Sequence, residues 1–302
     1  MMVEVEILHE DDKSMQLLLK KTDRALANAL RRTMIADVPK FAIHRMRMDI
    51  GMITDEADGE TYESLGAMSD EMLGHRCAMV PVPTFFEKEE HIPRYFQDEC
   101  PDCKDLVPEQ RGCPQCSVIY AIEQKGTEEG HTVTAEHLVV MGDMKLQIPE
   151  EYRTIPLTKL YKGQYLKAVL WAVLGRGRDH AKFSPVAGVT FRPRQKGVMA
   201  KPRKAKLLFD LDLTITRKDF TKGVLDNTDK VDLLRSDLNH VGEGTAREVE
   251  FDGAIVLEDV EGEFVFSFET DGSMTARICF EQACIELNRR FTDLSKDIVD
   301  AL

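Results

Sequence analysis

The sequence has few aromatic residues and no long apolar run. Of its 302 residues, 7% are aromatic and only one is tryptophan. No stretch approaches the roughly 20 consecutive apolar residues that a membrane-spanning helix needs. The opening Met1–Glu6 also lacks the basic and apolar segments of a secretory signal peptide. We therefore expect a cytoplasmic protein whose seven cysteines are thiols or metal ligands rather than disulfides.

Positively charged residues are fewer than negatively charged ones. The chain has 40 Lys and Arg against 53 Asp and Glu, a net charge of −13, which argues against non-specific nucleic-acid binding by the whole molecule. The exception is the basic span, residues 153–206, which holds fourteen Lys or Arg and a single acid, Asp179. This span supports one alternative function, a zinc-containing nucleic-acid-binding protein. Its aromatic residues are mostly placed as core residues, which makes base stacking doubtful.

Familiar catalytic motifs are also missing. The sequence contains no G-x-S-x-G, no P-loop and no H-E-x-x-H. Its eight histidines occur singly, beside ordinary strands or turns. Nothing therefore recommends catalysis by this chain alone.

Four cysteines form two C-P-x-C pairs separated by nine residues: Cys100, Cys103, Cys113 and Cys116. Cysteines at i and i+3 in a tight turn can aim both sulfur atoms at one point, and four thiolates complete a tetrahedral shell suited to one Zn²⁺ ion. An iron–sulfur cluster is the rival, although the compact ferredoxin run C-x₂-C-x₂-C is absent. Separate redox dithiols are a third interpretation. We expect the metal-binding loop at about residues 98–118.

Strand and helix patterns are mixed without a regular βαβ alternation, which predicts an α+β fold. Residues 3–7 and 15–19 alternate like a strand pair, 22–37 and 227–238 are predicted to be helices, and 155–174 is compatible with a helix. Further strands are predicted at 207–215, 254–257 and 264–268. Residues 55–63 are predicted to form an acidic loop.

The terminal stretch 273–302 has the most regular pattern in the chain. Apolar residues step by four and then three through a seam that comprises Phe280, Cys284, Leu287, Phe291, Leu294, Ile298 and Ala301. This spacing is typical of a narrow helix–helix seam rather than of a broad core-facing stripe. We expect a long helix, capped by Ser273, that pairs with a helix of another protein. Docking on the chain's own sheet is the alternative.

The predicted helix at 22–37 is amphipathic as well. Leu26, Leu30 and Met34 share one side, and the opposite side carries Arg24, Asn28, Arg31 and Arg32. A solvated polar face is the ordinary explanation of such a cluster.

Several segments together resemble the alpha-like subunits of cellular RNA polymerases. They are N-A-L-R-R-T-M-I at 28–35, H-R-x-x-x-x-P at 75–81, G-x-x-H-A-K-F-x-P-V at 177–186, and F-E-T-D-G-S at 268–273. They occur in the family's order and cover nearly the whole chain. The resemblance is strongest to the archaeal members, counterparts of the third-largest subunit of eukaryotic enzyme II.

This resemblance implies a discontinuous dimerisation domain, residues 1–46 and 184–302, with a mainly β insert domain at 47–183 that carries the four-cysteine loop. It implies a non-catalytic assembly platform for transcription, within a nucleotidyltransferase complex. The terminal helix would pair with the small subunit L, and Asn28, Arg31 and Arg32 would face the large catalytic subunits. Small subunits N and P would complete the platform.

One departure concerns the metal. Many archaeal relatives carry a ferredoxin-like cysteine insertion, but here residues 221–252 contain no cysteine. We therefore do not carry over an iron–sulfur cluster. The four cysteines lie after the H-R-x-x-x-x-P segment, where the eukaryotic counterpart holds zinc, although the spacing differs. One zinc ion is the expected cofactor.

Overall fold

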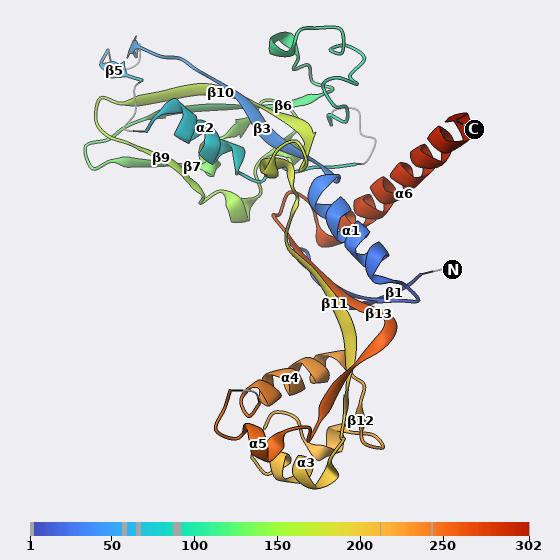
Figure 1. Cartoon of the computed structure of the whole chain (residues 1–302). Coiled ribbons are helices and arrows are strands. Elements are labelled where there is room, and N and C mark those ends of the chain that lie inside the picture. The colour runs from blue at the N-terminus through green and yellow to red at the C-terminus, as the bar shows by residue number, and fades with distance from the viewer. Residues whose placement is uncertain are drawn as a thin grey trace. The chain divides into compact units, whose positions relative to one another are not determined.

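The computed structural model describes residues 3–55, 59–64, 68–86, 92–211, 213–242 and 244–301. The chain forms two compact units, each built from separate segments (Figure 1). The first unit comprises Met1–His9, Gln16–Asn28 and Thr190–Ser267. The second comprises Glu10–Met15, Ala29–Val189 and Phe268–Leu302. No described helix is long and apolar enough to cross a membrane.

The first unit is organised around a five-stranded sheet whose order is β1-β2-β13-β11-β12. Its strands are β1 (Glu4–Glu10), β2 (Ser14–Lys20), β11 (Val186–Val198), β12 (Val224–Leu225) and β13 (Val256–Thr270). The unit also holds α3 (Pro202–Phe209), α4 (Thr228–Asn239), α5 (Glu248–Phe251) and the 3-10 turn η6 (Arg217–Asp219). These helices enclose a small core in which Leu208, Leu234 and Ile255 are buried.

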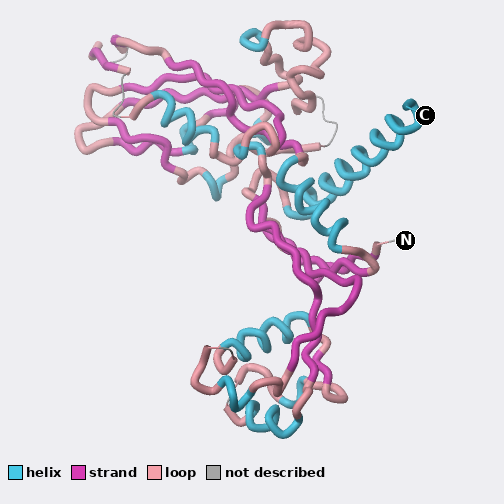
Figure 2. The backbone as a smooth tube through the Cα atoms, viewed as in Figure 1, coloured by secondary structure: helices cyan, strands magenta, loops and turns pink. Residues whose placement is uncertain are grey.

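The second unit is built on a four-stranded sheet, drawn in magenta in Figure 2, whose order is β3-β10-β6-β8. Its strands are β3 (Pro39–Met48), β6 (Ser117–Lys125), β8 (Val139–Val140) and β10 (Tyr165–Arg176). The pairings β3–β10, β10–β6 and β6–β8 are antiparallel. Two hydrogen-bonded strand pairs accompany this sheet: β4 (Met52–Thr54) with β5 (Thr61–Glu63), and β7 (His131–Thr134) with β9 (Pro156–Leu160).

The helical elements of the second unit are α2 (Asp70–Ala78), α6 (Ala276–Ala301) and the 3-10 turns η1 (Pro108–Gln110), η2 (Ala135–His137), η3 (Met144–Leu146), η4 (Glu150–Tyr152) and η5 (Ala181–Phe183). Helix α1 (Arg24–Ala36) has residues in both units. The core is centred on fully buried Phe41, Tyr120 and Leu170, from three neighbouring strands of the large sheet. The last of the four cysteines, Cys116, immediately precedes β6, so the cysteine loop is joined directly to this sheet.

The prediction of a helix at 155–174 is wrong, because these residues form β9 and most of β10. A continuous apolar run such as residues 168–174 fits a buried strand as well as a buried helix. The β-sheet pairing decides the matter: β10 lies between β3 and β6, so both of its edges are hydrogen-bonded. Neither neighbour is close to it in the sequence.

Smaller corrections concern element bounds. The predicted strand 207–215 is wrong: Pro202 starts α3 and Asp210 follows its last turn, while residue 212 lies outside the described residues. The strands predicted at 254–257 and 264–268 belong to one strand, β13, which begins at Val256. Its polar middle stays in the strand because β13 pairs with neighbouring strands on both sides. The acidic loop predicted at 55–63 ends in β5, which pairs with β4 just before the loop, and its residues 56–58 lie outside the described part.

The helix caps also differ from the prediction. Helix α6 starts at Ala276, and the Thr275 hydroxyl, not that of Ser273, accepts from the N–H of Ile278. Ser273 instead donates to the Asp271 carboxylate. Helix α1, predicted from residue 22, starts at Arg24, and the Asp23 carboxylate accepts from the N–H of Leu26. The residue types suit capping in each case, and the exact position depends on where the preceding strand ends.

Candidate functional site

The structure brings the four predicted cysteines together. One Sγ atom from each of Cys100, Cys103, Cys113 and Cys116 lies within 4.8 Å of all the others. The Sγ atoms of Cys100 and Cys113 are 3.5 Å apart, and those of Cys113 and Cys116 are 3.7 Å apart. A tetrahedral ion with metal–sulfur bonds of about 2.3 Å places its ligands about 3.8 Å apart. The donor set therefore fits a single tetrahedral ion.

Each C-P-x-C pair is a tight turn closed by backbone hydrogen bonds. The carbonyl of Cys100 accepts from the N–H groups of Cys103 and Lys104, and the carbonyl of Cys113 accepts in the same way from Cys116 and Ser117. The Gln115 side chain then donates to the Asp102 carboxylate at 2.8 Å, which joins the two turns. These bonds hold all four thiols on one side of the loop.

The thiols are unequal in acidity. The backbone N–H of Gly112 favours a thiolate and lowers the pKa of Cys103 to about 7. Burial raises the pKa of the Cys113 and Cys116 thiols. A metal ion would reverse the effect of burial, because a coordinating thiol is deprotonated.

The cysteine loop is attached to the large sheet through Arg45 and Trp171. The Arg45 guanidinium donates to the carbonyl of Glu109 at 2.6 Å and lies 4.3 Å from the centroid of the Trp171 ring. Gly112 has a φ of +146°, and a Cβ atom there would come within 3.3 Å of the same ring. A side chain at 112 would thus be strained and crowded, which explains the glycine.

Helix α6 packs on its own unit through one short face only. Its buried residues are Ala276, Cys279, Ala283 and Glu286, and every residue from 288 to 301 is exposed. Arg277 adds an ion pair to Glu10. Within the described residues, the contacts that fix α6 therefore lie in its first half and near its middle.

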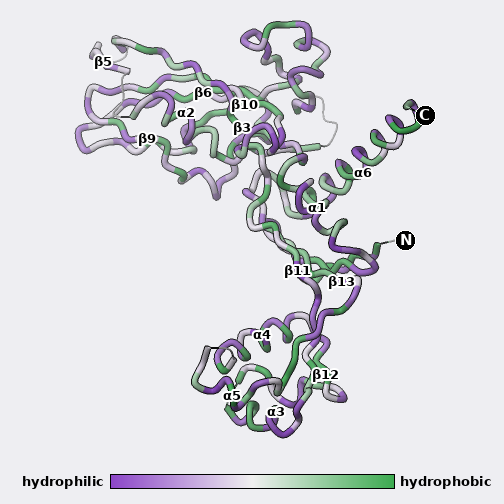
Figure 3. The backbone as a smooth tube through the Cα atoms, viewed as in Figure 1, coloured by the Kyte–Doolittle hydropathy of each residue, from purple (hydrophilic) through white to green (hydrophobic). Residues whose placement is uncertain are grey.

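The residues of the predicted seam become more exposed from the first half of α6 to its second half. Phe280 is half-buried and stacks on Phe268 with ring centroids 6.5 Å apart, and Leu287 is also half-buried. Phe291, Leu294 and Ile298 are 56%, 53% and 52% exposed, and Cys284 is exposed. Hydrophobic residues continue along α6 almost to its end (Figure 3). A regular apolar row this exposed is what a protein-binding helix presents.

A buried ion pair fixes the middle of α6. Arg176, at the end of β10, donates to both carboxylate oxygens of Glu286, at 2.8 and 3.4 Å. Phe96 covers the guanidinium with its ring centroid 4.9 Å away. Asp37, just after α1, accepts from Arg176 through its carbonyl and pairs with Arg290 through its carboxylate. This network joins the end of α1 to α6.

Sequence patterns did not identify Arg176 and Glu286 as partners. Glu286 sits between two seam positions and has the pattern of a solvated acid, and Arg176 lies in a glycine–arginine segment with no recognisable motif. No local signal distinguishes them from exposed charges, because their partnership spans 110 residues.

The predicted polar face of α1 is only partly exposed. Arg32 is exposed, whereas Asn28 and Arg31 are half-buried and make contacts within the chain. On the apolar side, Leu30 and Met34 are buried as the amphipathic pattern predicts, and Leu26 is half-buried. The assignment of Asn28, Arg31 and Arg32 as partner-binding residues stays a prediction.

Most cations of the basic span have a carboxylate partner in the same chain. Eight of the fourteen form ion pairs: Lys162, Lys167, Arg176, Arg178, Arg192, Arg194, Lys196 and Lys201. Arg194, for example, lies 2.8 Å from Glu263 and 2.9 Å from Asp226. The excess of positive charge in the sequence is therefore largely offset in the folded chain.

Comparison with known proteins adds a consistent set of relatives. The family described as the RNA polymerase Rpb3/Rpb11 dimerisation domain matches residues 16–291. The chain is 28% identical over 297 residues to DNA-directed RNA polymerase subunit Rpo3 of Picrophilus torridus, which covers 97% of this chain and 99% of the relative. It is 30% identical over 291 residues to the Rpo3 subunit of Thermoplasma volcanium, covering 95% of each. It is also 25% identical to subunit 3B of RNA polymerases IV and V of Arabidopsis thaliana, covering 90% of this chain and 84% of the relative.

Proposed function

The chain belongs to the RNA polymerase Rpb3/Rpb11 dimerisation domain family, and we propose that it is a non-catalytic assembly-platform subunit of a DNA-directed RNA polymerase. Its relatives over nearly their full length carry the name of the archaeal polymerase subunit Rpo3. In this role it pairs with the small subunit L, and the pair then binds the large catalytic subunits. As part of an archaeal enzyme that transcribes DNA, the subunit would be located in the cytoplasm, where the DNA is.

The exposed seam of α6 is the observation that carries this proposal. Phe291, Leu294 and Ile298 lie on one side of a helix that nothing else in the described chain covers at that point. Complete burial of side chains of this size contributes about 1.5–3 kcal/mol each, and roughly half of their surface is still exposed. A helix of subunit L packed against the seam would remove this surface from water.

We assign the remaining contacts by the same reasoning. Asn28, Arg31 and Arg32 of α1 contact the large subunits, and small subunits N and P complete the assembly. The dimerisation domain comprises residues 1–46 and 184–302, and residues 47–183 form the insert domain. The buried Arg176–Glu286 pair supports this arrangement, because it fixes the direction in which α6 leaves the sheet.

The four-cysteine loop binds one structural zinc ion in this proposal. The ligands would be Cys100, Cys103, Cys113 and Cys116, whose sulfur separations suit a single ion. An iron–sulfur cluster puts several iron and sulfide atoms between its thiolates and needs them farther apart. The zinc ion would hold the loop's fold and take no part in chemistry.

The alternative, a zinc-containing nucleic-acid binder, loses support from the ion pairs. A protein that binds nucleic acid non-specifically needs Lys and Arg free to contact phosphates. Here more than half of the basic span's cations already contact carboxylates of their own chain.

The test is co-expression of the full chain with subunit L from the same genome. We expect the two to co-purify as a 1:1 complex, and the chain alone to self-associate or to be poorly soluble. Elemental analysis of the complex should give one zinc per heterodimer. A monodisperse monomer that shows no affinity for L would contradict the platform role.

A further inference from the structure

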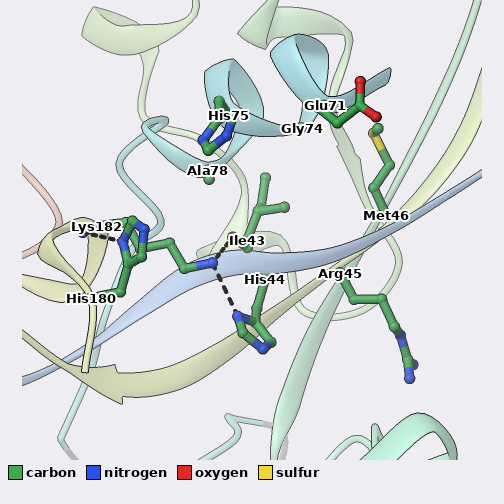
Figure 4. A pocket seen from close by; sticks show the side chains of 10 residues that line it. All are labelled: Ile43, His44, Arg45, Met46, Glu71, Gly74, His75, Ala78, His180 and Lys182. Carbon is green, nitrogen blue, oxygen red and sulfur yellow. Dashed lines mark hydrogen bonds between the residues drawn. The ribbon is translucent and has the colours of Figure 1, made fainter. Parts of the chain in front are cut away.

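A pocket in the second unit lies apart from both the cysteine cluster and α6. It has a volume of about 290 Å³ and is bounded by β3, α2 and the segment around η5 (Figure 4). Its polar lining includes His44, His75, His180, Lys182 and Glu71. These side chains come from three separate stretches of sequence, so the fold alone creates the pocket.

Lys182 is the central group of this pocket. Its ammonium donates to the carbonyl of Ile43 at 3.0 Å and lies 3.0 Å from Nδ1 of His44, as Figure 4 shows. An ammonium carries three N–H donors, so a third remains for a ligand. The other cation of the lining, Arg45, is turned toward Trp171 and the cysteine loop.

The half-buried Lys182 differs from the best-buried cations of the same unit. Lys40 is 4% exposed and pairs with Asp271, and Arg176 is 5% exposed and pairs with Glu286. Within the described part of the chain, no carboxylate lies within ion-pair distance of Lys182, although Glu71 lines the same pocket. Its contacts among the described residues are all with uncharged groups: the Ile43 carbonyl, the His44 imidazole and the Phe183 ring, whose centroid lies 5.1 Å from the ammonium.

A partly desolvated cation without a counter-ion is costly. Burial lowers the pKa of the Lys182 ammonium and that of the His44 imidazole, which is the direction expected where charge is unfavourable. Both effects would be relieved by an anion in the pocket. The exposed His75 and His180 offer additional ring N–H donors at its rim.

We propose that this pocket receives a carboxylate side chain, Asp or Glu, from another protein subunit, with Lys182 as its ion-pair partner and the histidines as hydrogen-bond donors. The inference rests on the proposed function, because it assumes a multi-subunit assembly. A side-chain carboxylate suits an open pocket of this size. The net charge of −13 opposes the approach of a nucleic-acid phosphate.

Zero-length cross-linking of the assembled polymerase tests the contact directly. A carbodiimide activates a carboxylate, the lysine amine attacks it, and an amide bond forms while the carboxylate oxygen leaves with the urea by-product. We expect mass spectrometry to find a peptide that joins Lys182 to an Asp or Glu of another subunit. Equal labelling of Lys182 by an amine reagent in the assembly and in the free chain, with no such cross-link, would overturn the proposal.

Substitution gives an independent test. Lys182→Met in the reconstituted assembly should weaken retention of one subunit about tenfold at moderate salt, and Lys182→Arg should retain most of it. Lys162→Met is the matched control, because Lys162 is exposed and lies outside the pocket lining. Full retention of every subunit with Lys182→Met would overturn the proposal.

The outcomes separate this inference from the proposed function. If subunit L pairs with the chain but Lys182 stays accessible, only the pocket proposal fails. If no assembly forms with the wild-type chain, both fail. Protection of Lys182 in the free chain by sodium acetate alone, at millimolar concentration, would identify a free small carboxylate as the occupant and overturn the protein-partner assignment.

Discussion

Single charged residues decide how α6 is held. Arg176 and Glu286 are 5% and 7% exposed, and a pair buried this deeply is a weak source of stability by itself. Removal of one partner is a different matter, because it leaves the other charge buried and uncompensated. The pair therefore makes one orientation of α6 far more favourable than the alternatives.

We predict that Glu286→Ala destabilises the second unit by about 3–5 kcal/mol. The guanidinium of Arg176 would lose its carboxylate while still covered by Phe96. Denaturant unfolding, followed by a signal from Trp171 in the same unit, measures the effect. Glu281→Ala, at an exposed position of the same helix, should change the transition little. Equal midpoints for the two variants would show that the pair does not fix α6.

Asp219 gives a pH-dependent prediction in the first unit. The Lys230 ammonium, followed by the N–H and hydroxyl of Thr216, lowers the pKa of its carboxyl group from 3.8 to about 2. A lowered pKa in the folded state stabilises the fold above the unfolded value, and this contribution is lost as the pH falls from about 4 to 2. Asp219→Asn should therefore make the stability depend less on pH in that window. Near pH 7 the slope of stability against pH should stay unchanged. Thermal unfolding at several pH values tests this, and an unaltered acid slope would contradict it.

At the scale of elements, α6 presents two kinds of surface along its length. Its first half packs against its own unit through small residues, Ala276, Cys279 and Ala283, which permit close approach. Its second half keeps larger apolar residues exposed on a side adjacent to the buried face. Residues at i, i+3 and i+4 share a side of any helix, so the pattern is visible in sequence before the partner is known.

The seam makes a specific prediction about pairing. Leu287→Asp together with Phe291→Asp should lower the affinity for subunit L more than a hundredfold, since the complex would bury two unpaired charges. Co-purification and titration of the purified chains measure this. Lys296→Asp introduces a negative charge on the opposite side of the same helix and should leave pairing intact. Circular dichroism should show equal helix content in both variants; unchanged pairing by the double variant would contradict the seam.

Strand β10 shows how an element can be misassigned. Its apolar run suggested a helix, but its edges are paired with β3 and β6 through residues more than 35 positions away. A register shift between Trp171 and Ala172 on the β3 side accompanies the contact of Arg45 with Trp171. The middle of β10 thus contacts the cysteine loop through Trp171 and Arg45, and the end of β10 supplies Arg176 to the pair with Glu286.

At the scale of the whole molecule, the cysteine loop differs from the rest of the chain in how it is stabilised. Each unit has an apolar core of its own, around the helices of the first and on the large sheet of the second. The cysteine loop of the second unit has a core of little more than the four cysteines and Tyr95. A segment with so little buried apolar surface would depend on the proposed metal ion for a defined fold.

We predict that metal removal affects this loop selectively. A chelator or Cys113→Ser should increase hydrogen exchange of residues 98–116 at least tenfold, and leave the centre of β10 and the first unit protected. Zinc content should fall to zero with Cys113→Ser, whereas Cys284→Ser, which changes an exposed thiol outside the cluster, should keep one ion. Slow exchange of the loop after complete metal loss would show that its hydrogen bonds suffice.

The sequence by itself determined the features that depend on local spacing: two C-P-x-C turns, an apolar row on a terminal helix, and the ordered motifs of a polymerase subunit family. Local geometry specifies each of these, because residues three or four apart in a turn or helix lie close together whatever the tertiary structure. Only the tertiary structure decided that residues 165–176 are a strand, that Arg176 and Glu286 are buried partners, and that Lys182 has no carboxylate partner among the described residues. These outcomes depend on pairing and desolvation between distant segments, which no local pattern encodes.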